Sequence, residues 1–249
     1  METLHAGRDV RTQPKEASEC WTPSPDQLPQ FGLNLTYSLA DYLGRAIVTG
    51  RFDDKPFPVE TALARRHGVS KSVTREALKM LSAKGLLTAR PRQGTLVQPA
   101  SSWNLFDSDV LRWLADRKLK MNLLRELNQL RAAIEPQAAS LAACKWAIAD
   151  LRGIEQGLRR IEAAKDGLDE PAAASVAFHV AILRATQNPF YAQFRDIVST
   201  ALQTSLRLDG NLRENLAGLR EYAAVFDAIR AREPDNAQTA MRHLINETL

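Results

Sequence analysis

The chain has 249 residues, of which 45% are apolar and 25% are charged, and its net charge is +4. This composition is typical of globular proteins, and no apolar run is long enough for a membrane-spanning helix. The N-terminus lacks the apolar segment of a signal peptide, and the two cysteines lie too far apart in sequence to indicate a disulfide framework or a cysteine zinc site. We therefore expect a soluble cytoplasmic protein with no membrane partner.

The positive charge is concentrated in one block of the sequence. Residues 35–100 carry 11 basic and five acidic side chains, whereas residues 101–249 carry 19 of each. A basic block beside a larger neutral one suggests a polyanion-binding module attached to a module with another task. Charge alone leaves open the alternative of a solvated basic surface.

The first part of the chain divides into a tail and three short helices. Residues 1–33 contain four prolines and no periodicity, so we expect a disordered tail. From Leu35 onwards, apolar residues recur at helical spacing and glycines mark the helix ends. We predict helices over residues 35–49, 58–67 and 71–84, with Pro58 in the first turn of the second helix and Ser70 as the N-cap of the third.

A hairpin is predicted after these helices. Two β-prone runs, Leu86–Ala89 and Thr95–Val97, flank a turn that contains Pro91 and Gly94. Three helices followed by a hairpin are the order of a winged helix-turn-helix, and the short glycine-containing turn before the third helix fits that motif. We therefore predict a DNA-binding domain over residues 34–99.

The rest of the chain is predicted to be helical. A linker over residues 100–120 precedes a helical domain over residues 121–249, which is rich in alanine and has no β-branched runs. The expected helices are 122–142, 147–165, 170–187, 189–208, 212–232 and 235–248. The predicted fold class is mainly α, with an N-terminal winged helix-turn-helix and a C-terminal all-α antiparallel helical bundle.

The candidate DNA-binding residues lie on the third helix and at the hairpin turn. A recognition helix reads the major groove with its first turns, where lysine and arginine match the guanine O6 and N7 acceptors. Arginines at the turn suit the minor groove or phosphates. The candidates are Lys71, Ser72, Thr74, Arg75, Arg90, Arg92 and Gly94. The alternative is that Arg75 pairs with Glu60 or Glu76 and that the turn is merely solvated.

Residues 45–97 resemble the winged helix-turn-helix of the GntR family of bacterial transcription regulators. The matching motifs are Pro58-x-Glu60, Val69–Ser70, Arg75–Glu76–Ala77–Leu78, Gly85–Leu86 and Gly94–Thr95. The resemblance implies that operator DNA is a partner and adds Thr61 to the DNA-binding residues. Thr61 and Lys71 stand where the family usually has arginines that contact DNA, whereas a third arginine is retained as Arg75. Threonine lacks the bidentate guanine contact of arginine, so we expect an operator sequence that differs from the usual one.

The second half resembles the all-helical effector (FCD) domain of the FadR subfamily. The similarity lies in Arg131–Ala–Ala–Ile–Glu135–Pro136, Phe178–His179, Asn188–Pro189 and Met241–Arg–His243. The linker sequence WNLFDSDVLRWL further resembles regulators of sugar-acid catabolism, such as galactonate-operon repressors. The resemblance implies a ligand-responsive regulator, most often a repressor, whose effector is a sugar acid or another small carboxylate.

Most such effector domains hold a divalent metal on an aspartate and three histidines. The corresponding positions are Ser175, His179, Tyr222 and His243, and only the two histidines are good ligands for zinc, nickel or manganese. Hydrogen-bonded core histidines are one alternative. The interpretation we favour is a metal-free effector pocket lined by these four residues. Arg131 would bind a carboxylate effector there, unless it pairs with Glu135.

Two other classes of function are alternatives. An architectural DNA-binding protein without an effector would have an apolar-filled helical domain, whereas polar residues recur at the pocket positions here. A metal-dependent enzyme would need more than two histidines without a nucleophile or phosphate loop, so no enzyme is predicted. Because one module offers few base contacts, we expect a homodimer on a short inverted repeat.

Overall fold

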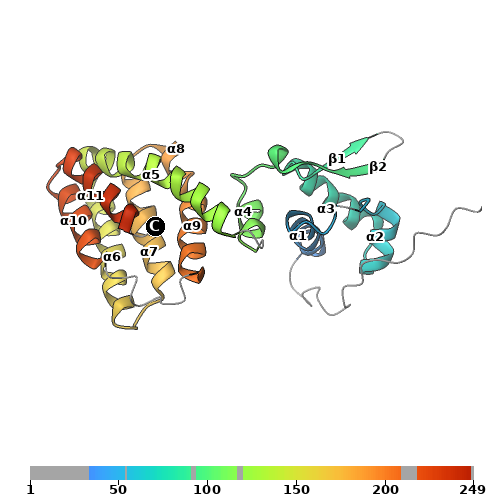
Figure 1. The fold of residues 1–249 in the computed structure, drawn as a ribbon, viewed down its shortest axis with the longest axis horizontal. Coiled ribbons are helices and arrows are strands. Elements are labelled where there is room, and N and C mark those ends of the chain that lie inside the picture. The colour runs from blue at the N-terminus through green and yellow to red at the C-terminus, as the bar shows by residue number, and fades with distance from the viewer. Residues whose placement is uncertain (1–33, 54, 91–93, 117–119, 209–217, 248–249) are drawn as a thin grey trace, which may run out of the picture.

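The computed structural model describes residues 34–53, 55–90, 94–116, 120–208 and 218–247. A small module of helices and a hairpin lies beside a helical bundle, and one short helix, α4 (Ser108–Ala115), lies between them (Figure 1). Helices predominate and the only sheet in the described ranges has two strands, which confirms the mainly α fold class. The predicted disordered tail, residues 1–33, lies outside the described residues.

The small module has the predicted order of elements. Its strands are antiparallel, with Leu87 opposite Val97. A 3₁₀ turn, Ala100–Ser102, follows the hairpin. The elements are α1 (Leu35–Val48), α2 (Glu60–His67), α3 (Lys71–Ala83), β1 (Leu87–Arg90) and β2 (Gly94–Val97).

The turn between α2 and α3 is built from a glycine and a serine cap. Gly68 ends α2 in the left-handed region, with φ of 63°, which glycine adopts without steric cost. Ser70 then accepts a hydrogen bond from the Val73 amide at 3.2 Å, as its predicted N-cap role requires. Pro58 was expected inside the first turn of α2, but the helix begins at Glu60 and Val59 is its N-cap.

Helix α4 is part of the core of the small module, although its sequence was predicted to be a linker. Val110, Trp113 and Leu114 of α4 pack with Leu43 and Ile47 of α1. The Trp113 ring lies against Gly44, where an added Cβ would come within 2.3 Å of it. The glycine therefore allows α4 to pack directly on α1.

Ion pairs attach α4 to the same module. Lys84 Nζ, just after α3, binds Asp107 at 2.7 Å and Asp109 at 2.9 Å. The Tyr37 hydroxyl of α1 donates to Asp109 at 2.6 Å. Burial would raise the pKa of Asp109, but hydrogen bonds from Tyr37, Arg112 and Lys84 outweigh it and lower the pKa to about 2.

The bundle contains seven helices in the described ranges. The segment predicted as one helix over residues 189–208 forms two, because the amides of Gln193 and Phe194 bond to carbonyls three residues back and so make a turn. The part of the predicted helix 212–232 that precedes residue 218 lies outside the described residues. The helices are α5 (Lys120–Lys145), α6 (Ile148–Lys165), α7 (Pro171–Ala185), α8 (Pro189–Ala192), α9 (Arg195–Leu208), α10 (Leu219–Arg230) and α11 (Pro234–Glu247).

Helix α7 lies among α5, α6 and α9 and buries Phe178, Ile182 and Leu183 in the bundle core (Figure 1). It approaches α6 closely at Gly157, where an added Cβ would lie 2.6 Å from the Phe178 Cα. In the part of the chain that the structure describes, no helix is both long and apolar enough to cross a membrane.

Candidate functional site

The predicted DNA-binding residues lie on α2, α3 and the hairpin. Thr61, Lys71, Ser72 and Arg90 are exposed. Gly94 is also exposed and begins β2 with φ of 82°, which favours glycine at this turn. The remaining hairpin candidate, Arg92, lies outside the described residues.

The structure corrects the prediction that Thr74 contacts DNA. Its side chain is 0% exposed, and its Oγ1 donates to the Ser70 carbonyl at 3.1 Å. Thr74 shares its helix face with Ala77 and Leu81, three and seven residues further on, and this is the face that α3 buries.

Arg75 remains on the exposed face, but it is paired with a carboxylate. Its Nε donates to Glu60 Oε2 at 3.3 Å and its Nη2 donates to Glu60 Oε1 at 3.0 Å. Glu76, the other partner considered from the sequence, instead binds Lys79 at 2.8 Å. The Arg75 side chain is still 60% exposed, so the ion pair leaves part of the guanidinium open to solvent.

A buried polar cluster lies inside the bundle, where α5, α7 and α10 meet. Arg131 Nε donates to Glu135 Oε1 at 2.6 Å, and its Nη1 donates to Asn128 Oδ1 at 3.1 Å. These three α5 side chains are at most 3% exposed. The third nitrogen, Arg131 Nη2, is buried and has no hydrogen-bond partner among the described residues.

Glu135 connects α5 to α7. Its second oxygen, Oε2, bonds to His179 Nδ1. Burial would raise the pKa of Glu135, but the positive Arg131 guanidinium and the His179 imidazole outweigh burial and lower the pKa to about 2. The carboxylate is therefore ionised at neutral pH and balances the charge of Arg131.

A pair of hydroxyls lies beside this ionic group. Ser175 Oγ of α7 and the Tyr222 hydroxyl of α10 are 2.8 Å apart and both are buried. The Tyr222 and His179 ring centroids are 5.8 Å apart. Burial raises the pKa of Tyr222 against the smaller opposing effect of the Ser175 hydrogen bond, so the phenol stays neutral.

His243 does not join this cluster, contrary to our prediction. The side chain is exposed, because α11 buries Ala237, Met241, Leu244 and Ile245 instead. Consecutive residues of a helix point about 100° apart, so Leu244 can lie on the buried face while His243, the residue before it, points away from that face. His179 and His243 therefore do not face a common site.

The residues present do not fit the divalent metal that the sequence resemblance implies. Ser175 is a poor neutral ligand, Tyr222 is held as the phenol, and His243 lies on the exposed face of α11, so His179 is the one good ligand left among the four. Among the described residues there is no group of three or more His, Cys, Asp or Glu side chains that is placed to hold a metal ion.

Sequence reasoning missed part of this cluster. Glu135 was considered only as a competing partner of Arg131, and Asn128 was not anticipated. The available signal was spacing, because Asn128 and Glu135 lie three residues before and four residues after Arg131 and therefore share its helix face. The link from Glu135 to His179, which joins residues 44 positions apart, had no local signal.

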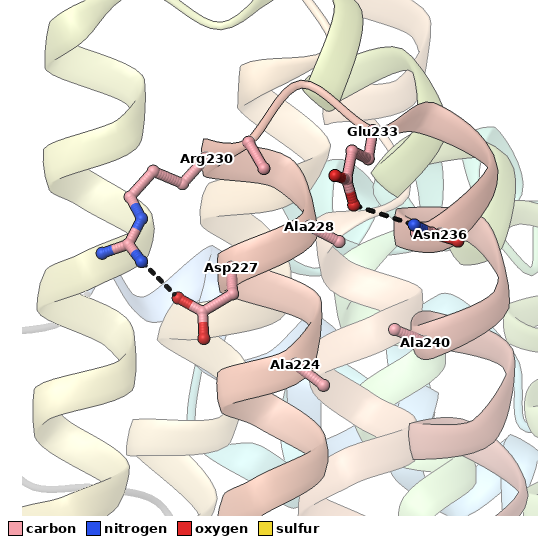
Figure 2. A pocket seen from close by; sticks show the side chains of 8 residues that line it. Ala224, Asp227, Ala228, Arg230, Glu233, Asn236 and Ala240 are labelled. Atoms are coloured by element: carbon pink, nitrogen blue, oxygen red, sulfur yellow. Dashed lines mark hydrogen bonds and ion pairs between the residues drawn. The ribbon is translucent and has the colours of Figure 1, made fainter.

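A surface groove of about 740 Å³ between α10 and α11 is separate from this cluster (Figure 2). Alanines line much of it, and its charged groups are already paired. Arg230 binds Asp227 at 2.8 Å, and Asn236 donates to Glu233 at 2.8 Å. None of the predicted site residues lines this groove.

Comparisons with known proteins agree with the two-part architecture. The model of the bacterial regulatory proteins of the gntR family matches residues 35–97, and the FCD domain model matches residues 126–247. The chain is 29% identical to the galactonate operon transcriptional repressor of Escherichia coli strain K12, over 86% of this chain and 94% of that protein. It is 28% identical to the HTH-type transcriptional regulator LutR of Bacillus subtilis strain 168, over 74% of this chain and 86% of that protein.

The chain shares its overall fold with a solved structure. That structure is Lar, described as controlling expression of the Listeria monocytogenes agr system, and it superimposes with a TM-score of 0.56. The match covers 88% of this chain and 96% of that chain at 15% identity, so it supports the fold alone.

Proposed function

Because the chain belongs to the GntR family of bacterial regulatory proteins and carries an FCD domain, we propose that it is a ligand-responsive transcriptional repressor. In this proposal a homodimer binds a short inverted repeat of operator DNA in the cytoplasm. A small carboxylate, for which a sugar acid is the candidate, binds inside the bundle and releases the DNA. No catalytic role is proposed, since the matched families and relatives are regulators.

The observation that carries this proposal is the unpaired nitrogen of Arg131. A buried guanidinium N–H without an acceptor costs free energy, and a carboxylate oxygen is the acceptor that matches it best. Glu135 neutralises the guanidinium but reaches only its Nε. Arg131 Nη2 is therefore still available to a ligand carboxylate.

The neighbouring hydroxyl groups of the protein favour a carboxylic acid that carries hydroxyl groups over one that carries none. Ser175 and Tyr222 each donate and accept hydrogen bonds, as the hydroxyl groups of a sugar acid do. Tyr222 is close enough to Arg131 and Glu135 for their charges to act on its phenol. The name of the galactonate operon repressor, among the matched relatives, points to the same class of ligand.

Binding at Arg131 would act on the DNA-binding module through α5. Leu127, one turn before Arg131, packs with Leu111 of α4 and with Ile197 of α9. Since α4 belongs to the core of the small module, a shift of α5 would move that module. The effector switches the protein only if it binds one arrangement of the modules more tightly than the other.

Calorimetry with galactonate, with and without EDTA, tests the proposal. We expect binding that survives EDTA, falls about tenfold in Tyr222→Phe through loss of one hydrogen bond, and is lost in Arg131→Gln. Circular dichroism of each variant separates loss of the site from loss of the fold. Arg159→Gln, which removes a solvent-exposed guanidinium from α6, is the matched control and should bind normally.

The same variants then enter an operator-release assay. Galactonate should release wild-type protein and Arg159→Gln from DNA at equal concentrations, and Tyr222→Phe only at higher concentrations. A panel of aldonic and uronic acids that all fail to bind would contradict the effector class. Binding that disappears in EDTA would contradict the metal-free pocket.

A further inference from the structure

The Glu60–Arg75 ion pair lies on the exposed face of α3 that carries the predicted DNA-binding residues Lys71 and Arg75. Glu60 is the first residue of α2, and Arg75 lies in the second turn of α3. The carboxylate contacts the guanidinium along one edge, through Nε at 3.3 Å and Nη2 at 3.0 Å. The opposite edge, formed by Nη1 and the second N–H of Nη2, is not used by Glu60.

The unused edge belongs to a side chain that is well exposed. The Arg75 side chain is 60% exposed, whereas the Glu60 side chain is 29% exposed. Lys71 is one turn earlier on the same face of α3 and is also exposed. Glu60 therefore holds Arg75 by its inner edge, formed by Nε and Nη2, while the outer edge, formed by Nη1 and Nη2, remains open.

We propose that Glu60 is a specificity-determining residue that holds Arg75 for reading one guanine. This inference rests on the proposed DNA-binding function. Guanine presents N7 and O6 as an acceptor pair in the major groove, and the outer edge of a guanidinium matches both. Holding the inner edge removes side-chain freedom before binding, so less entropy is lost on contact.

The negative charge of Glu60 has a second effect on the choice of contact. A phosphate approaching Arg75 meets the Glu60 carboxylate and is repelled, whereas a neutral guanine edge is not. The carboxylate therefore favours the base over the backbone as the partner of Arg75. It also weakens binding to every duplex, because DNA is negatively charged.

The proposal predicts that specificity and overall affinity change in opposite directions in Glu60→Gln. The amide is neutral and has one acceptor oxygen, whereas the carboxylate has two. We expect weaker discrimination of guanine together with tighter binding to unrelated DNA. If Glu60 only stabilised the start of α2, its replacement would lower the melting temperature and leave base preference unchanged.

The test begins with wild-type protein and a random 25-base-pair duplex library. Sequencing the selected pool and repeating the selection with Arg75→Ala identifies the guanine that depends on Arg75. Binding is then measured to that duplex and to a copy with adenine in place of the guanine. We expect at least about tenfold preference for guanine in wild type, from one bidentate contact, and under about threefold in Glu60→Gln.

Glu76→Gln is the matched control. It also removes one negative charge, but from α3, and Glu76 is paired with Lys79 and not with Arg75. It should strengthen binding to both duplexes and keep the guanine preference. The double variant Glu60→Gln/Arg75→Ala should discriminate no less than Arg75→Ala alone, since the two residues act as one unit.

A wild-type guanine preference in Glu60→Gln, whether or not the melting temperature falls, would overturn the proposal. So would a further loss of preference when Glu60→Gln is added to Arg75→Ala. Failure of the wild-type protein to select any sequence would instead contradict the proposed function.

Discussion

At the scale of single residues, the buried carboxylate of Glu135 makes the stability of the bundle depend on pH. Its pKa is about 2 in the folded protein against an ordinary value of 4.5, so stabilisation is complete above pH 4.5. It is lost as the pH falls from 4.5 towards 2, by about 3 kcal/mol for a shift of this size. Urea unfolding at pH 6, 4 and 2.5 measures the loss.

Glu135→Gln removes the titrating group and leaves Arg131 with a buried, unbalanced charge. We expect it to lower the unfolding free energy by about 3–5 kcal/mol at pH 6 and to flatten the dependence between pH 4.5 and 2. Glu155→Gln, which affects a solvent-exposed pair with Arg159, should change stability by less than about 1 kcal/mol. If the unfolding free energy of Glu135→Gln falls with pH as steeply as that of the wild type, other carboxyl groups are responsible for the loss of stability in acid.

At the scale of elements, α6 contains two glycines with opposite surroundings. A Cβ on Gly157 would lie 2.6 Å from the Phe178 Cα, whereas a Cβ on Gly153 would meet no atom within 4 Å. Gly157→Ala should therefore push α6 away from α7 and lower the unfolding free energy by about 1–3 kcal/mol. Gly153→Ala should raise it by about 0.5–1 kcal/mol, because alanine favours the helix.

Thermal or urea unfolding of the two α6 variants checks this pair directly. Phe178 precedes His179, so Gly157→Ala should also weaken galactonate binding, whereas Gly153→Ala should not. Equal effects of the two substitutions on stability would show that the close contact between α6 and α7 relaxes without cost.

At the scale of the whole molecule, α4 packs with both modules, so we expect it to transmit changes between them. Leu111 packs with Leu127 and Ile197 of the bundle, whereas Val110 and Trp113 on the same helix pack into the DNA-binding module. Leu111→Ala should leave operator and galactonate binding near wild type when each is measured alone. It should reduce their coupling, which is about 1–3 kcal/mol in allosteric proteins, so that galactonate releases less DNA.

Fluorescence anisotropy of labelled operator, titrated with galactonate, measures this coupling. Leu105→Ala is the control, because Leu105 lies in the same segment but is 46% exposed. Full release of DNA from Leu111→Ala at wild-type galactonate concentrations would mean that the signal takes another route.

Local signals in the sequence were sufficient for the order and nature of most elements. The Ser70 cap and the glycines after α1, α2 and α3 were recognised because they act over one or two turns of backbone. The basic block and the motif around Arg75 identified the DNA-binding module and its family, which the family models confirm. The helical domain was identified in the same way.

The composition of each site was decided only by the tertiary structure. Which face a helix buries depends on its partners. Thr74, expected to contact DNA, is therefore buried, and His243, expected in the buried pocket, is exposed. The Glu60–Arg75 pair joins two helices, as does the Glu135–His179 bond.

The tertiary structure also decided which segments belong to the DNA-binding module. The predicted linker became α4 because Trp113 fits against Gly44, which lies 69 residues earlier in the chain. Sequence patterns report local backbone preferences and the average burial of a segment. Contacts between distant segments depend on how complementary surfaces pack, and those contacts determine which polar groups lose water and which keep it.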